Sequence, residues 1–337
     1  MSAGGPSAAG FPQQLAQRIR AQGPMPLARA MALGNAHYYA NHPGLMRDFA
    51  TAPEISQMFG ELLAAWAVDL WQRAGKPDIH LVELGPGRGT LMSDMLRVFA
   101  RAGLAAPVHF VETSPALRLA QQRAVPAARF HAHPETLPAD RPLLVFANEF
   151  LDALPVTQFE RNALGWTVRT VVAQGDRLAF QAIEPVKLAM IPDAIRDAAP
   201  GSVFERNFAA EQLVSTLARR LAAQGGAALV IDYGHLGPAI GDTLQAIRDG
   251  QPADPLESLG EGDVTAHVDF AAIAHAAARA GATPFGVADQ GSFLLALGLR
   301  QRAEALKAAA SRDTRAGIEA AAARLAGAGA MGRLVSR

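Results

Sequence analysis

The spacing of hydrophobic positions changes near residue 79. Before that point, residues 13–34 and 52–75 have the three- and four-residue spacing of helices, and an apolar stripe runs from Ile55 to Trp71. After it, short apolar runs alternate with helical segments. The expected strands are residues 79–84, 107–113, 128–132, 141–150 and 225–235. This alternation predicts an α/β fold, a doubly wound parallel sheet with helices on both faces.

A second pattern interrupts the alternation between the fourth and fifth expected strands. Apolar and polar residues alternate there in three segments joined by turn signals, so we expect a small antiparallel β insertion. Later elements are a helix near 209–224, a helix at 269–280, a strand near 284–288, helices over 291–326 and a short strand at 332–336. The predicted domains are a disordered tail (1–12), an N-terminal helical cap (13–78), a doubly wound core (79–158 and 225–337) and a β/α insertion (159–224).

Composition narrows the class of protein. The chain has 337 residues, enough for one large elaborated domain, and its 31 basic and 31 acidic residues give no reason to expect a nucleic-acid partner. The absence of cysteine excludes disulfides, thiol catalysis and thiolate metal sites. We expect no metal site, and interpret His131 and His133 as histidines of a surface loop. With no apolar run of about 18 residues and no signal peptide, a cytoplasmic protein without a membrane span is expected.

The sequence HLVELGPGRGT (80–90) ends a buried strand in a glycine-rich turn. A phosphate-binding P-loop would need a lysine, which this turn lacks. The dinucleotide pattern G-x-G-x-x-G would need glycine at Thr90, whereas the third glycine here is Gly89. Three alternating glycines with Glu83 two residues before them are typical of S-adenosylmethionine (AdoMet) sites. Glu112, after the next strand, suits a ribose but also serves NAD, so an NAD oxidoreductase stays an alternative.

A second polar stretch, FANEFLDALPV (146–156), ends the fourth strand. Asn148, Glu149 and Asp152 follow a buried apolar run within five residues. Carboxylates at this edge of a doubly wound sheet can grip a cationic acceptor, such as a guanidinium, or accept its proton. The alternative for these residues is helix capping, and for Asp152 the sequence leaves both interpretations open.

Two later segments carry polar side chains toward the same predicted edge. VIDYGH (230–235) ends the fifth strand, so Asp232, Tyr233 and His235 are candidates for lining an acceptor site, with His235 a candidate proton acceptor. In DVTAHVDF (263–270), capping of the next helix by Thr265 is the plain explanation, and a site role for His267 is the weaker one.

These residues together resemble a known family. The matching stretches are DFATAPEISQMFGELLAAWAVDLW, VELGPGRGTLMSDMLR, VHFVETSPALR, ANEFLDALPV, GGAALVIDYGH, GDTLQAIR and DVTAHVDFAAIA. In this order they are similar to the MidA-type family of class I AdoMet-dependent methyltransferases, which is related to the mitochondrial complex I assembly-factor arginine methyltransferase. The resemblance implies a Rossmann-like methyltransferase fold with an N-terminal helical cap, and methyl transfer to a protein arginine in complex I biogenesis.

The resemblance also completes the expected site. The cofactor is S-adenosyl-L-methionine, leaving S-adenosyl-L-homocysteine as product. Its expected contacts are Glu54, Ser56, Glu83, Gly85, Pro86, Gly87, Gly89, Thr90, Glu112, Thr113, Ser114 and Asn148. The expected catalytic residues are Glu149, Asp152, Asn148 and His235.

Two other functions remain compatible with the sequence. One is a small-molecule O- or N-methyltransferase, with His235 or His267 as its base. The other is an assembly protein that binds AdoMet and works through contacts, with little catalysis. The sequence does not name the acceptor, the number of methyl groups transferred or the oligomeric state, and a homodimer is one of the states left open.

Overall fold

The computed structural model describes residues 10–41, 51–327 and 335–336. Its chain forms two compact units. The first unit consists of residues 1–49, 153–210 and 235–272, and the second of residues 50–152, 211–234 and 273–337. The boundaries of these units differ from those of the predicted domains, and the predicted domain division stays a prediction.

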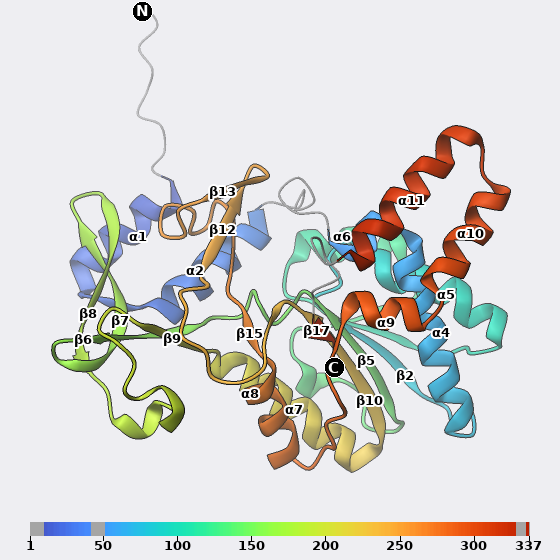
Figure 1. The fold of residues 1–337 in the computed structure, drawn as a ribbon, viewed down its shortest axis with the longest axis horizontal. Coiled ribbons are helices and arrows are strands. Elements are labelled where there is room, and N and C mark those ends of the chain that lie inside the picture. The colour runs from blue at the N-terminus through green and yellow to red at the C-terminus, as the bar shows by residue number, and fades with distance from the viewer. Residues whose placement is uncertain (1–9, 42–50, 328–334, 337) are drawn as a thin grey trace, which may run out of the picture. The chain divides into compact units, whose positions relative to one another are not determined.

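The second unit contains a seven-stranded sheet, of which β2, β5, β10 and β17 are labelled in Figure 1. Five strands are parallel, in the order β10-β5-β2-β3-β4, and β17 and β16 extend the sheet beyond β10 in antiparallel pairing. The bounds are β2 (His80–Leu84), β3 (Val108–Val111), β4 (Arg129–His131), β5 (Leu143–Asn148), β10 (Gly226–Asp232), β16 (Ala288–Asp289) and β17 (Val335–Ser336). The predicted parallel sheet is therefore confirmed. Strand order reverses at β2, and ligands of such sheets bind beyond the strand ends at that point.

Helices cover both faces of this sheet because its strands are apolar on both sides. On one face, Leu81 and Phe146 pack in a buried cluster with residues of α4 and α5, and on the other Val82 and Val145 pack with Leu217 of α7. The helices of this unit are α3 (Ala52–Ile55), α4 (Gln57–Arg73), α5 (Thr90–Ala102), α6 (Pro115–Ala124), α9 (Gln290–Ala296), α10 (Leu299–Ala309) and α11 (Arg312–Ala326), together with most of α7 (Phe208–Gln224) and α8 (Phe270–Arg279).

Two of the predicted helices are interrupted. Residues 13–34 contain α1 (Phe11–Gln22), β1 (Met25–Pro26) and the start of α2 (Leu27–Asn41), because Gly23 has a φ of 91° and is followed by Pro24 and Pro26. The predicted tail is wrong at its last two residues, since α1 begins at Phe11, and residues 1–9 lie outside the described part. The helix expected at 52–75 breaks at Ser56, whose backbone is extended.

The first unit contains the antiparallel sheet expected for the insertion. Its order is β1-β7-β6-β9, with β8 also paired to β7. The strands are β6 (Thr157–Asn162), β7 (Gly165–Gln174), β8 (Arg177–Pro185) and β9 (Val203–Arg206). Residues 234–265 contain short strands: β11 (Gly234–His235), which pairs β15 (Val268–Asp269), and β12 (Gln245–Arg248), which pairs β13 (Gln251–Ala253) and β14 (Asp263–Thr265).

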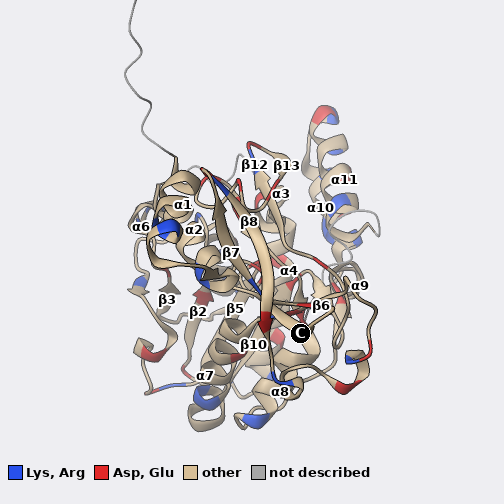
Figure 2. Cartoon of the chain, turned by 90° about the vertical axis from the view of Figure 1, so that its left-hand side faces the viewer, with Lys and Arg blue, Asp and Glu red and all other residues tan. Residues whose placement is uncertain are grey.

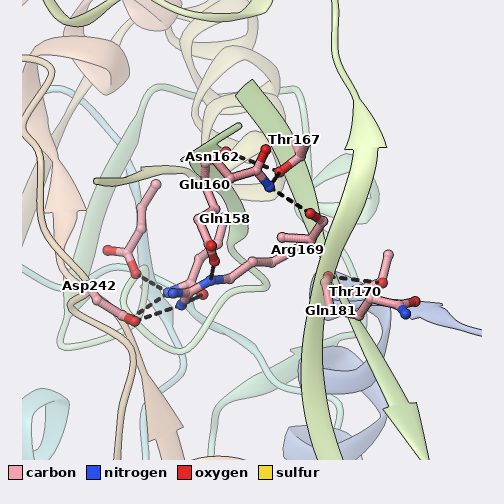
Figure 3. Close-up of polar contacts among 10 residues, drawn as sticks. Gln158, Glu160, Asn162, Thr167, Arg169, Thr170, Gln181 and Asp242 are labelled. Carbon is pink, nitrogen blue, oxygen red and sulfur yellow. Dashed lines mark hydrogen bonds and ion pairs between the residues drawn. The ribbon is translucent and has the colours of Figure 1, made fainter. Parts of the chain in front are cut away.

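A cluster of polar side chains on β6 and β7 binds Asp242, in the segment between β11 and β12, to the sheet of the first unit (Figure 3). Arg169 donates hydrogen bonds to Glu160, Gln158 and Asp242, over 2.8, 3.0 and 2.6 Å. Gln158 in turn donates to Asp242 and to the buried Glu205, both over 2.7 Å. Each polar group named here has a partner, so we interpret the cluster as structural support that holds Asp242 against β6 and β7.

Basic and acidic residues are interspersed over the described chain (Figure 2), in keeping with its zero formal net charge. Within the described residues, no helix is long and apolar enough to cross a membrane. The same residues contain no group of three or more His, Asp or Glu side chains placed to hold a metal ion.

Candidate functional site

The glycine-rich loop between β2 and α5 is the centre of the candidate site. Gly85, Gly87 and Gly89 have φ values of 58°, 55° and 82°. Residues other than glycine rarely adopt this left-handed backbone conformation. Gly85 N–H donates to the Val111 carbonyl over 3.0 Å, which ties the loop to the end of β3. A Cβ added at Gly87 would meet nothing within 4 Å, so another molecule can approach the backbone there.

Glu83 lies directly beneath this loop and is 3 % exposed. Burial raises the pKa of its carboxyl to about 8, and a hydrogen bond from the Met92 backbone opposes that rise. Among the described residues, none donates a hydrogen bond to its Oε2 atom. A buried carboxyl with a vacant acceptor is costly unless a cationic or donor group meets it, so this atom is suited to a ligand's ammonium group.

Glu112, at the end of β3, is held in place by its own turn and by α6. Its Oε1 accepts the backbone N–H groups of Thr113 and Ser114, both over 2.8 Å. Gln121 donates from Nε2 both to Glu112 Oε2, over 3.0 Å, and to the Gly87 carbonyl, over 2.8 Å. Three of about four acceptor positions of the carboxylate are thus used, and the remaining one lies on Oε2.

Gln121 is a site residue that sequence reasoning missed. It is fully buried and links the glycine loop to Glu112. No signal in its spacing distinguished it, because the neighbouring Gln122 has the same side chain and is exposed. Only the three-dimensional structure separates the two.

The short helix α3 brings Glu54 to the same loop. Glu54 Oε1 accepts a hydrogen bond from Thr90 Oγ1 over 2.5 Å, and its Oε2 lies 3.9 Å from Arg88 Nη1.

Three other predicted cofactor residues use their side chains or carbonyls for local structure. Ser56 Oγ caps α4 by accepting from Met58 N, Ser114 Oγ caps α6 by accepting from Leu117 N, and the Pro86 carbonyl accepts from Gly89 N.

The turn after β5 carries the predicted acceptor residues. Glu149 has a φ of 47°, an uncommon conformation for a residue with a side chain. Its Oε1 accepts from Ala52 N and from Asn148 Nδ2, each over 3.3 Å. Residues 149–153 form a turn without a helix, so the helix-capping interpretation of Glu149 and Asp152 does not apply. Asp152 is 4 % exposed and accepts a hydrogen bond from the Tyr233 hydroxyl.

The sequence suggested that Asp232 lines the acceptor site, but in the structure it does not face an open site. Its side chain is fully buried, and Oδ2 accepts the backbone N–H groups of Phe150, Leu151 and Asp152 over 3.2, 2.9 and 3.2 Å. Burial, and secondarily the nearby charge of Glu149, raises the pKa of Asp232 to about 8. Its position is behind the Glu149–Asp152 turn.

The other predicted histidine and threonine candidates belong to the first unit. His235 Nδ1 lies 2.6 Å from the Gly237 carbonyl oxygen. Burial lowers the pKa of His267, and the nearby His235 lowers it further. Thr265 is not the cap of α8: Asp269 Oδ1 takes that role, accepting from Ala271 and Ala272 over 2.9 and 3.1 Å. Thr265 instead ends β14.

His131 is not an isolated surface histidine either. It joins a row of imidazoles across three neighbouring strands, with nitrogen–nitrogen distances of 2.9 Å to His109 and 3.1 Å from His109 to His80. His80 contacts Asp140 over 2.9 Å at the other end. Burial, assisted by the neighbouring imidazoles, lowers the pKa of His109 to about 4, so the central imidazole of this row is uncharged at neutral pH.

A parallel sheet that reverses at β2, with a glycine loop and buried acids at its strand ends, defines a Rossmann-like AdoMet-dependent methyltransferase. Two crystal structures of superfamily members from Burkholderia thailandensis have this fold. One, bound to S-adenosyl-homocysteine, is 26 % identical with a TM-score of 0.78, and the other, a native structure, is 27 % identical with a TM-score of 0.81. Each comparison covers 99 % of this chain and 94 % of the other.

Sequence comparison identifies the family. Residues 62–288 match the family described as "Putative S-adenosyl-L-methionine-dependent methyltransferase", and the chain belongs to it. Similar curated proteins are the mitochondrial protein arginine methyltransferase NDUFAF7 of Danio rerio and of Homo sapiens and its homolog in Drosophila melanogaster. They are 35, 33 and 36 % identical, over 87, 87 and 88 % of this chain and 78, 74 and 76 % of theirs. The predicted family, fold class, cofactor and reaction class are confirmed.

The predicted cytoplasmic location is contradicted, because these relatives are mitochondrial proteins. The prediction failed for a chemical reason. A lack of cysteine and of apolar spans is compatible with any reducing aqueous compartment and does not single out the cytoplasm.

Proposed function

We propose that the protein transfers a methyl group from AdoMet to a guanidinium nitrogen of an arginine in a protein substrate. The observation that carries the proposal is the pair of acids on the turn after β5, where Glu149 is held in a left-handed conformation beside Asp152. The names of the curated relatives, which are protein arginine methyltransferases, support the same acceptor. By family resemblance, the biological setting is the biogenesis of respiratory complex I.

The side chains around the glycine loop suit the cofactor. Glu83 would accept the ammonium group of AdoMet at its vacant Oε2, and Glu112 would accept a ribose hydroxyl at its remaining position. Gly87 leaves room for close approach to the backbone. When bound, AdoMet supplies an electrophilic methyl group on its sulfonium.

The acids of the β5 turn would act on the acceptor. A guanidinium forms two charge-assisted hydrogen bonds with a carboxylate, which fixes its plane and orients one nitrogen. Glu149 is the residue proposed for this contact, with Asp152 and Asn148 supporting it, and an ionised carboxylate can also accept the proton that the nitrogen loses. Alignment of acceptor and donor supplies most of the acceleration in such a displacement.

The substitution Glu149→Gln tests this role. It keeps the size of the side chain and removes its charge, so methyl transfer should fall by about 100-fold or more, while affinity for S-adenosyl-homocysteine stays within about threefold. Transfer is measured with labelled AdoMet and affinity by calorimetry. Asp69→Asn, which neutralises an exposed acid on α4, is the control and should retain full transfer. Wild-type transfer by the Glu149 variant would overturn the assignment.

A further inference from the structure

Asp232 is not among the expected catalytic residues, but its side chain organises the turn that carries two of them, Glu149 and Asp152. Asp232 ends β10, and the strand pairing places Ile231 of β10 opposite Asn148 of β5. The two strands therefore end side by side, and the Glu149 N–H donates to the Ile231 carbonyl over 2.8 Å. From this position the Asp232 side chain lies directly behind the turn.

Asp232 satisfies four backbone N–H groups at once. Oδ2 accepts from three consecutive residues, Phe150, Leu151 and Asp152, and Oδ1 accepts from Tyr233 over 2.9 Å. Consecutive N–H groups that converge in this way form a backbone nest, which is normally an anion-binding site. Here the group that fills the nest is a carboxyl group of the protein itself, and it is fully buried.

The nest explains how Glu149 keeps its unusual backbone conformation. A left-handed residue with a side chain persists only where the surrounding structure determines it. Glu149 is the residue immediately before the three N–H groups that Asp232 fixes, and its own N–H is fixed by the end of β10. Tyr233 closes the other side of the turn, because its hydroxyl donates to Asp152.

The same contacts connect the turn to the glycine loop. The ring of Phe150 occupies the space beside Gly85, where an added Cβ would lie 2.4 Å from Phe150 Cδ2. Fixing the Phe150 backbone therefore also fixes the ring that packs against the loop. A displaced turn would move Glu149 and this ring together.

We propose that Asp232 is a positioning residue for methyl transfer, which acts through Glu149 by holding the Glu149–Asp152 turn in its reactive conformation. This proposal rests on the proposed function. Because the Asp232 side chain is fully buried, the proposal gives it no contact with acceptor or cofactor. A conservative change at this position should therefore alter turnover and the local backbone, with little change in cofactor affinity.

The variant Asp232→Asn keeps the side-chain shape and one acceptor oxygen. We expect kcat to fall by about 100-fold, since small displacements of reacting groups have effects of that size, while affinity for S-adenosyl-homocysteine stays within about threefold. The double variant with Glu149→Gln should be within about threefold of Glu149→Gln alone, because residues that act through one another are not additive. Multiplied losses in the double variant would overturn the proposal.

Hydrogen exchange provides a readout that does not depend on activity. In Asp232→Asn, the amides of residues 150–152 should exchange at least about tenfold faster than in the wild type, with an unchanged rate over β2. Asp94→Asn, which alters a buried acid paired with Arg97 on α5, is the matched control and should leave those amides unchanged. Unchanged exchange at 150–152 would contradict the role of Asp232. If exchange at residues 150–152 is faster in Asp232→Asn than in the wild type, but the wild type methylates no protein arginine, the role of Asp232 in the turn stands and only the proposed function fails.

Discussion

Glu83 is the residue at which stability and binding oppose each other. Its folded-state pKa of about 8 exceeds the ordinary value of 4.5, because burial disfavours the charged form. Between those two values the folded state retains a proton that the unfolded chain has lost. The free energy of unfolding contributed by Glu83 is therefore fully present below pH 4.5 and falls as the pH rises toward 8.

The variant Glu83→Gln should be more stable and bind less well. Removing the titrating group should raise the free energy of unfolding at pH 8.5 by up to about 5 kcal/mol, because the pKa is raised from 4.5 to about 8 and one pKa unit corresponds to about 1.4 kcal/mol. Urea unfolding at pH 5 and pH 8.5 measures this, and part of the pH dependence should remain because the pKa of Asp232 is raised as well. Affinity for S-adenosyl-homocysteine should fall more than about tenfold, because a neutral amide pairs poorly with an ammonium. Unchanged affinity would contradict the role of Glu83.

At the scale of elements, α3 connects the two halves of the candidate site. Glu54 accepts from Thr90 at the start of α5, and the Ala52 N–H, two residues earlier, donates to Glu149. A helix of four residues thus contacts both the glycine loop and the acidic turn. The extended Ser56 makes this possible, because it separates α3 from α4 and lets the short helix take its own direction.

The glycine loop gives a matched pair of substitutions. Gly87 and Gly103 both have positive φ, at 55° and 75°, and a Cβ at either would meet nothing within 4 Å. Alanine at each position should therefore cost a similar amount of stability, about 1 kcal/mol. Gly87→Ala should weaken S-adenosyl-homocysteine binding by about tenfold or more because its methyl group occupies the approach to the loop. Gly103→Ala, at the other end of α5, should bind like the wild type.

Thermal unfolding and calorimetry measure both properties for this pair. Equal affinities in the two alanine variants would show that the loop backbone is not approached by the ligand. A loss of binding in Gly103→Ala would indicate that strain in α5, and not contact at Gly87, sets the affinity.

At the scale of the whole molecule, the sequence predicts what depends on local pattern. The alternation of apolar runs and helices predicted the parallel sheet, and the spacing of Gly85, Gly87 and Gly89 predicted the loop. Breaks that depend on single residues, such as Gly23 and Ser56, were missed because the apolar spacing continues across them.

Contacts between distant parts of the chain are the features that the sequence could not provide. Asp232 was recognised as polar and well placed, but its three partners lie about 80 residues away, at 150–152. Gln121 differs from Gln122 only in the direction of its side chain from α6. The composition of the first unit, from three separate segments, likewise follows from packing that has no local signature.

Identification of the methylated residue tests whether the protein transfers methyl groups to arginine through Glu149. The wild-type protein and Glu149→Gln are each incubated with labelled AdoMet and lysate of the host cell, and the labelled protein is digested and sequenced by mass spectrometry. We expect a methylated arginine in a protein substrate with the wild type and none with the variant. Label in a small molecule, on another amino acid, or equally with both proteins would contradict it.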